Sequence, residues 1–160
     1  MTKFIELKVT AELIVASASL TPEEVSKCVQ VECDRSWKTG DPRGKTGKSW
    51  ATHGWVLRSI KSAEQGDDAV NSLVSSCVGD LIQRLKPIAA KVRDLSREGD
   101  VGVSIDILAS HVPALNFDHE VLKVIADAGA WLQIDLILWN PPDEEDLTAQ
   151  RRAAVSIPIV

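Results

Sequence analysis

The segment from Gly40 to Ser49 holds the residue types of a phosphate-binding loop, because glycines, lysines and a serine follow one another closely. A P-loop needs four residues between its first glycine and the Gly-Lys pair, so that successive amides can wrap the phosphate. Gly40 and Gly44 enclose only three, and for Gly47-Lys48-Ser49 the required glycine position is Pro42, whose nitrogen carries no hydrogen. The next residues do not form a helix pattern that could face an anion. The spacing therefore excludes P-loop chemistry.

Positive charge is nevertheless concentrated around this segment. Residues 35–58 contain six Lys and Arg side chains against Asp41 alone, whereas the whole chain has a net charge of −5. Three tryptophans lie among these charges, and indole faces beside cations can stack on bases or hold a phosphate-bearing ligand. The alternative, which we favour, is that the tryptophans anchor the loop while the charges stay in water. The candidate ligand-binding residues are Lys38, Asp41, Arg43, Lys45, Lys48, Trp50, Trp55 and Arg58.

The other reactive residue types do not form a recognisable site. Cys28 and Cys77 read as small buried hydrophobic residues, and Cys28 and Cys33 lack the close spacing and second cysteine pair of a zinc site. Asp106 and Asp135 could act as acid and base if their strands pair, but the simpler interpretation is a solvated sheet face. No serine or cysteine lies in a nucleophile motif. We therefore predict no catalytic residues, no metal and no cofactor.

Composition sets the class of protein. A chain of 160 residues with 44% apolar and 26% charged residues suits one globular domain. Its net negative charge excludes wrapping of nucleic acid by a basic surface and leaves only residues 35–58 for such contact. The apolar N-terminal residues are interrupted by charges and predict neither a signal peptide nor a membrane span. An odd cysteine count suits a reducing compartment, so we expect a cytoplasmic protein without membrane contact.

Local patterns predict alternating strands and helices. The strands are expected over Phe4–Val15, Trp55–Lys61, Val101–Leu108 and Trp131–Trp139. A first helix should begin at Thr21 with a capping box and run to about Val31, and another should begin at Asp118 and stop at Gly129. Between them, a helix opened by Asp67 and Asp68 should break at Pro87, with a second segment ending near Gly99. Residues 34–54 show no periodicity and are expected to be a long loop.

This order indicates an α+β fold, specifically a two-layer sandwich with a mainly antiparallel sheet, helices on one face and a ferredoxin-like order β-α-β-α-β-α-β. Residues 1–140 should form the single domain, and residues 141–160 a C-terminal tail that could add an edge strand. The apolar segment Ile157–Val160 makes a homodimer plausible. One sheet face should gather polar residues and face solvent or a partner: Glu6, Lys8, Glu12, Asp106, Gln133 and Asp135.

The chain resembles the bacterial domain-of-unknown-function family 4279 over most of residues 4–138. The matching pieces are residues 20–25, Gly40-Asp41 with Arg43, residues 55–59, residues 81–85 with Pro87, and residues 128–130 leading into Ile134-Asp135. Each piece is short, so their order carries the resemblance. The resemblance implies a single cytoplasmic α+β domain of no established activity and supplies no catalytic residues. This sequence departs from the family in lacking tyrosine and in its tail after Asn140.

Three functions remain open on the sequence. The leading hypothesis is a non-enzymatic protein that binds another protein, of which a toxin-blocking immunity role is one form. The second is a module that binds an anion, a nucleotide or single-stranded nucleic acid through the basic, tryptophan-containing loop 35–58. The third is an enzyme that uses Asp106 and Asp135.

Overall fold

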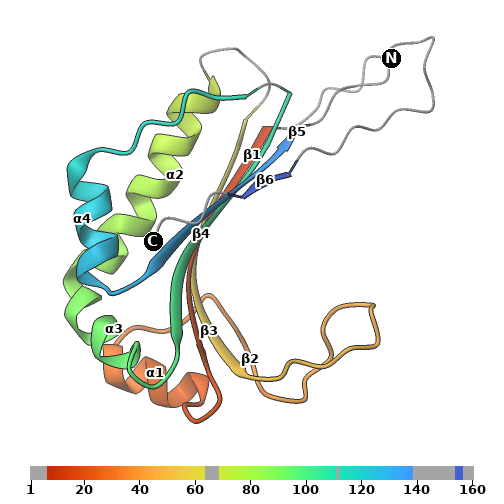
Figure 1. Cartoon of the computed structure of the whole chain (residues 1–160), viewed down its shortest axis with the longest axis vertical. Helices are drawn as coiled ribbons and strands as arrows, with labels where there is room; N and C mark the ends of the chain where they lie inside the picture. The colour runs from red at the N-terminus through yellow and green to blue at the C-terminus, as the bar shows by residue number, and fades with distance from the viewer. Residues whose placement is uncertain (1–6, 64–68, 111, 139–153, 157–160) are drawn as a thin grey trace.

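The computed structural model describes residues 7–63, 69–110, 112–138 and 154–156. Its strands are β1 (Leu7–Ser17), β2 (Arg35–Trp37), β3 (His53–Ala63), β4 (Asp100–Ala109), β5 (Trp131–Leu138) and β6 (Ala154–Ser156). Its helices are α1 (Pro22–Val29), α2 (Ala69–Leu85), the 3-10 turn η1 (Lys86–Ile88), α3 (Ala89–Leu95) and α4 (His119–Asp127). Figure 1 shows one twisted sheet with the helices gathered on one side of it.

The helix ends lie where the local sequence places them. The Thr21 side chain accepts a hydrogen bond from the Glu24 amide, and the Glu24 carboxylate accepts one from the Thr21 amide, which completes the predicted capping box before α1. Pro87 lies in η1, where it separates α2 from α3 as predicted. The Asp118 carboxylate caps α4 by accepting from the Val121 amide at 2.8 Å.

The strand order across the sheet is β2-β3-β1-β4-β5-β6. The β4–β5 pair is parallel and the other four pairs are antiparallel, so the prediction of an α+β fold with a mainly antiparallel sheet is confirmed. The ferredoxin-like order is wrong. Helix α4 returns the chain so that β5 lies parallel beside β4, and the short strand β2 adds an edge that the hydrophobic pattern did not reveal.

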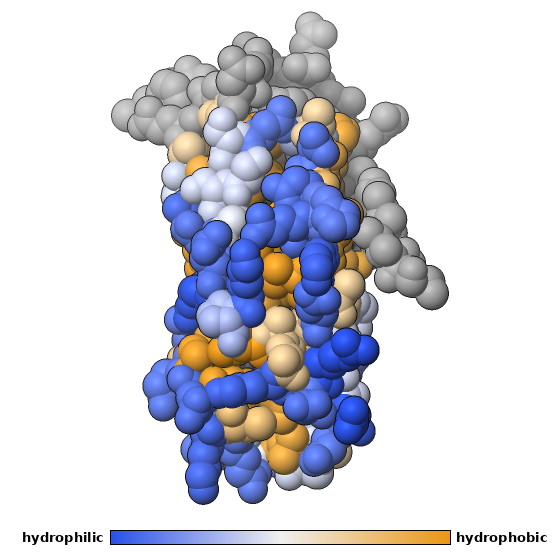
Figure 2. Space-filling view, turned by 90° about the vertical axis from the view of Figure 1, so that its left-hand side faces the viewer, coloured by the Kyte–Doolittle hydropathy of each residue, from blue (hydrophilic) through white to orange (hydrophobic). Residues whose placement is uncertain are grey.

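The sheet has one helix-covered face and one open face. On β1 the side chains of Leu7, Val9, Ala11, Leu13 and Val15 point to the helices and are buried in the hydrophobic core. Figure 2 views the helix side, where hydrophilic residues cover most of the helices and hydrophobic residues show between them. The strand registers place Lys8, Glu12, Asp106, Gln133 and Asp135 together on the open face, as predicted. Glu6 lies outside the described residues.

Two predicted segments differ from the structure. Residues 34–54 are not one irregular loop, because β2 lies inside them and β3 begins at His53. In the predicted tail, Ala154–Ser156 form β6, which pairs antiparallel with β5. The tail segment Ile157–Val160, on which the homodimer expectation rests, lies outside the described residues.

Candidate functional site

The connection between β2 and β3, residues 38–52, forms a hairpin-like arm. Three backbone hydrogen bonds hold its sides together: the Arg43 amide donates to the Lys48 carbonyl at 2.7 Å, the Trp50 amide to the Asp41 carbonyl at 2.9 Å, and the Gly40 amide to the Trp50 carbonyl at 2.8 Å. The tip turns through Gly44 and Gly47, whose φ angles of +60° and +70° favour glycine. Figure 1 shows the arm projecting from the sheet on the side away from the helices.

Asp34 fastens the start of β2 to the body of the protein. Its Oδ2 accepts hydrogen bonds from the Arg58 amide at 2.6 Å and from the Arg84 guanidinium of α2 at 2.7 Å. Burial alone would raise the pKa of this carboxyl group, but the hydrogen bonds from Arg84 and Arg58 outweigh it and leave the pKa lowered. Asp34 is therefore ionised at neutral pH and holds the edge strand against β3.

A tryptophan pair braces the base of the arm against the sheet. Trp37 of β2 lies over Gly54, its cross-strand neighbour on β3, so closely that a Cβ at Gly54 would lie 2.0 Å from the indole ring. Trp50 stacks on Trp37, with ring centroids 4.2 Å apart and planes inclined by 22°. The absence of a side chain at Gly54 is thus what lets the indole pair pack onto the strand.

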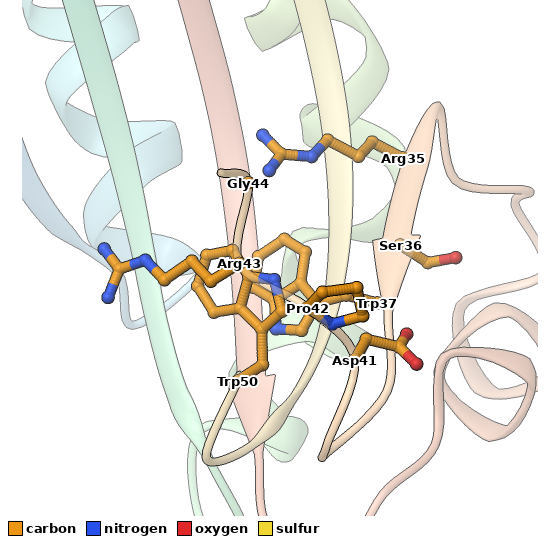
Figure 3. A pocket seen from close by; sticks show the side chains of 8 residues that line it. All are labelled: Arg35, Ser36, Trp37, Asp41, Pro42, Arg43, Gly44 and Trp50. Atoms are coloured by element: carbon orange, nitrogen blue, oxygen red, sulfur yellow. The ribbon is translucent and has the colours of Figure 1, made fainter. Parts of the chain in front are cut away.

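Two arginines adjoin this pair. The Arg43 guanidinium carbon lies 4.7 Å from the Trp50 ring centroid, and that of Arg35 lies 5.3 Å from the Trp37 centroid. Both distances are within the range of cation–π attraction. The two arginines and the two indoles line an open pocket of about 630 Å³ together with Ser36, Asp41, Pro42 and Gly44. In Figure 3 the Arg35 guanidinium lies above the indole pair and the Arg43 guanidinium extends to its left, whereas the Asp41 carboxylate points to the right.

Four cations of this region have no ion pair with a carboxylate of the described residues: Arg35, Arg43, Lys45 and Lys48. The Nε1 hydrogen of Trp37 is likewise buried and finds no acceptor within the described ranges. A buried indole N–H usually has a partner. The pocket therefore offers two guanidinium groups to a ligand, whereas the Trp37 N–H is enclosed by the protein.

Some predicted site residues lie elsewhere. Trp55 is wholly buried on the helix-covered face of β3, where its Nε1 donates to Ser26 Oγ at 2.9 Å, so Trp55 belongs to the core and cannot contact a ligand at the arm. Lys38 forms an ion pair with Glu23 at 2.7 Å, and the hydrogen bond to Glu23 raises the Lys38 pKa. Arg58 pairs with Glu12 on the open face.

The remaining candidates lie on the arm. Arg43 and Trp50 line the pocket, Lys45 and Lys48 are exposed near the tip, and Asp41 shapes a turn by accepting from the Lys38 amide at 2.6 Å. The candidate residues did not include Arg35 and Trp37, although both lie in the basic window. The glycine at position 54 could have indicated that a large side chain packs there, but identifying that side chain as Trp37 requires the strand register.

The carboxylates proposed for acid–base chemistry lie side by side on the open face. Asp106 and Asp135 are register partners of the parallel pair β4–β5, and the Gln133 amide donates to Asp135 at 2.8 Å. Burial, with further contributions from the negative charges of Asp135 and Glu12, raises the pKa of Asp106, while Arg58 opposes the rise. The predicted pairing is confirmed, and the two carboxylates lie on the open face of the sheet.

Asp106→Asn should raise the melting temperature at pH 7. A carboxyl group whose pKa is raised by folding favours the folded state when protonated, and this contribution is lost as pH rises through the raised pKa. The melting-temperature difference between variant and wild type should therefore shrink as pH falls through the raised pKa and should be lost by about 3.8, the ordinary value for aspartate. Thermal unfolding from pH 3 to pH 7 measures it, with Asp94→Asn on α3 as the control. A difference that does not depend on pH would contradict the raised pKa.

The described ranges hold neither a candidate metal site nor a candidate membrane span. They contain no group of three His, Cys, Asp or Glu side chains placed to hold a metal ion. No helix in them is both long enough and apolar enough to cross a membrane.

The fold and the site together define a class of protein: a small α+β protein with one sheet, helices on one face and a tryptophan-braced cationic arm. The chain belongs to the family described as Domain of unknown function (DUF4279), whose model matches residues 6–139. No curated protein and no solved structure matches the chain. The family assignment agrees with the resemblance found in the sequence and leaves the function to be argued from the site.

Proposed function

We propose that this protein is a non-enzymatic binding module that recognises another protein through its arm. The observation that supports this most strongly is the bracing of the arm. Hydrogen bonds between its two sides and the packing of Trp37 on Gly54 keep Arg35 and Arg43 beside a pocket in the folded chain. Preorganised side chains lose less conformational entropy on binding, so they bind a partner more tightly than a floppy loop would.

Charge indicates what kind of partner surface this is. The arm and β2 present four cations without carboxylate partners among the described residues, on a chain whose net charge is −5. Such a local positive region attracts an acidic surface and steers its approach, while the negative body repels it elsewhere. An immunity role, in which the partner is a toxin, is one specific form of this proposal. The three cysteines are free thiols, which suits a cytoplasmic location.

Affinity capture tests the proposal when it compares matched variants. The wild-type chain should recover a protein that is lost with the triple charge reversal Arg43→Glu, Lys45→Glu and Lys48→Glu. The same protein should still be recovered by a control variant with Lys27→Glu and Arg97→Glu, which reverse exposed charges on the helix side. Recovery of the same proteins by every variant, or of none by the wild type, would count against the arm as an interface.

Binding of an anion, a nucleotide or single-stranded nucleic acid is the second candidate. It is favoured by the two guanidinium groups at one pocket, because arginine binds phosphate with two parallel hydrogen bonds. The lack of an available indole face argues against base stacking. The Trp37 ring is covered by Gly54 and Trp50, and the Trp50 ring by Trp37 and Arg43. Trp55 is buried in the core. Nucleotide and oligonucleotide panels at low salt, followed by tryptophan fluorescence and melting temperature, distinguish it. A shift that the charge reversals abolish would favour this candidate over a protein partner.

A further inference from the structure

We infer that the pocket between Arg35 and Arg43 is a binding site for a side-chain carboxylate of an acidic peptide segment. This inference rests on the proposed protein-binding function and names the chemistry of its contact. Two observations carry it: the two arginines that line the pocket without carboxylate partners among the described residues, and the charge distribution on the neighbouring sheet.

Neither guanidinium group forms an ion pair with a carboxylate of the described residues. Each lies near an indole, Arg35 near Trp37 and Arg43 near Trp50, which restricts the side chain while leaving its N–H donors free. Figure 3 shows both groups directed away from the Asp41 carboxylate, with Arg35 above the indole pair and Arg43 to its left. The planar fork of arginine matches a carboxylate with two parallel hydrogen bonds. Two such forks at one pocket are suited to an anionic group.

The surroundings favour a carboxylate on a peptide over the phosphates of a nucleic acid. Both indoles have occupied faces, so no base can stack without displacing Arg43. Farther along the same open face lie Asp106 and Asp135, whose negative charges repel a polyphosphate backbone that tracks across the sheet. A peptide needs only one or two carboxylates at the arginines, and those of its residues that lie near Asp106 and Asp135 can be uncharged.

Access to the pocket is open. Strand β2 lies at one edge of the sheet and its residues Arg35 and Ser36 are exposed. On the inner side, the open face continues through Val56 and Ile14, which are in register with Arg35. An extended segment can therefore place a carboxylate between the arginines while its backbone lies along the sheet edge.

Fluorescence anisotropy with the full chain tests the inference. The probe is a labelled eight-residue peptide of alternating Glu and Gly with blocked termini, and its control has Gln in place of Glu. We expect saturable binding of the Glu peptide at low salt and none of the Gln peptide. Arg35→Ala and Arg43→Ala should each weaken binding about tenfold, the effect of losing one charge-assisted contact. Arg43→Lys should also weaken it, because lysine keeps the charge and loses the fork. Arg97→Ala should leave it unchanged.

Each contrary outcome points to a different error. Equal binding of the Glu and Gln peptides, or no effect of either arginine variant, would overturn the carboxylate site. Binding of an oligothymidylate that competes at the same arginines, with no binding of the Glu peptide, would overturn it in favour of phosphate. Failure of the peptide while the captured protein still depends on the arm would overturn this inference alone. Loss of arm-dependent capture as well would overturn the proposed function.

Discussion

Trp55→Ala is expected to lower the free energy of unfolding by about 3–5 kcal/mol, the range for removing a large aromatic side chain from a core. Trp55 has 0% exposed surface, and its indole reaches from β3 to Ser26 of α1. Its removal leaves a cavity between the sheet and the first helix and breaks the hydrogen bond that joins them. Because single domains are stable by only about 5–15 kcal/mol, denaturant unfolding should show a large decrease in midpoint.

Two further variants keep this prediction testable if Trp55→Ala does not fold. Trp55→Phe retains a buried ring and loses the N–H donor to Ser26, so the loss should be about 1 kcal/mol. Trp50→Ala removes an indole from the arm, where the stacking with Trp37 and the exposed contact with Arg43 are lost, and should cost about 1 kcal/mol. Equal destabilisation by Trp55→Ala and Trp50→Ala would contradict the placement of one indole in the core and the other on the arm.

Gly54→Ala is expected to disrupt the arm although it adds a single methyl group. The new Cβ would lie 2.0 Å from two ring atoms of Trp37, far closer than two non-bonded carbon atoms can approach. The backbone of β3 is held on both sides by β1 and β2, so the indole must move. Such overpacking typically costs about 1–3 kcal/mol. The near-ultraviolet circular dichroism of the stacked indoles should change, and binding of the acidic peptide should be lost.

Gly79→Ala is the matched control for this substitution. Gly79 lies within α2 with open space around the position of a Cβ, and alanine in a helix interior is more favourable than glycine by about 0.5–1 kcal/mol. It should therefore raise stability and leave the indole signal and peptide binding unchanged. If Gly54→Ala behaved like Gly79→Ala, the close packing of Trp37 on the strand, and with it the bracing of the arm, would be refuted.

The elements that the sequence predicted well are those with local causes. The capping box at Thr21 and Glu24, the N-cap at Asp118 and the break at Pro87 depend on residues within one turn of each other, and all three are present. The alternation along β1 depends on neighbours two residues apart. The predicted strand order was wrong because strand pairing depends on contacts between residues far apart in the chain, which no local pattern encodes.

The same distinction between local and long-range causes applies to the candidate site. The gathering of positive charge and tryptophans in residues 35–58 can be read from the sequence, because composition does not depend on conformation. The folded chain was needed to show that Trp55 enters the core, that Arg58 pairs with Glu12 and that Arg35 joins Arg43 at one pocket. Successive residues of a strand point to opposite faces, so the side that each residue occupies follows from how β3 is paired within the sheet. That pairing puts Gly54 beneath Trp37 on the open face and Trp55 among the helices on the other.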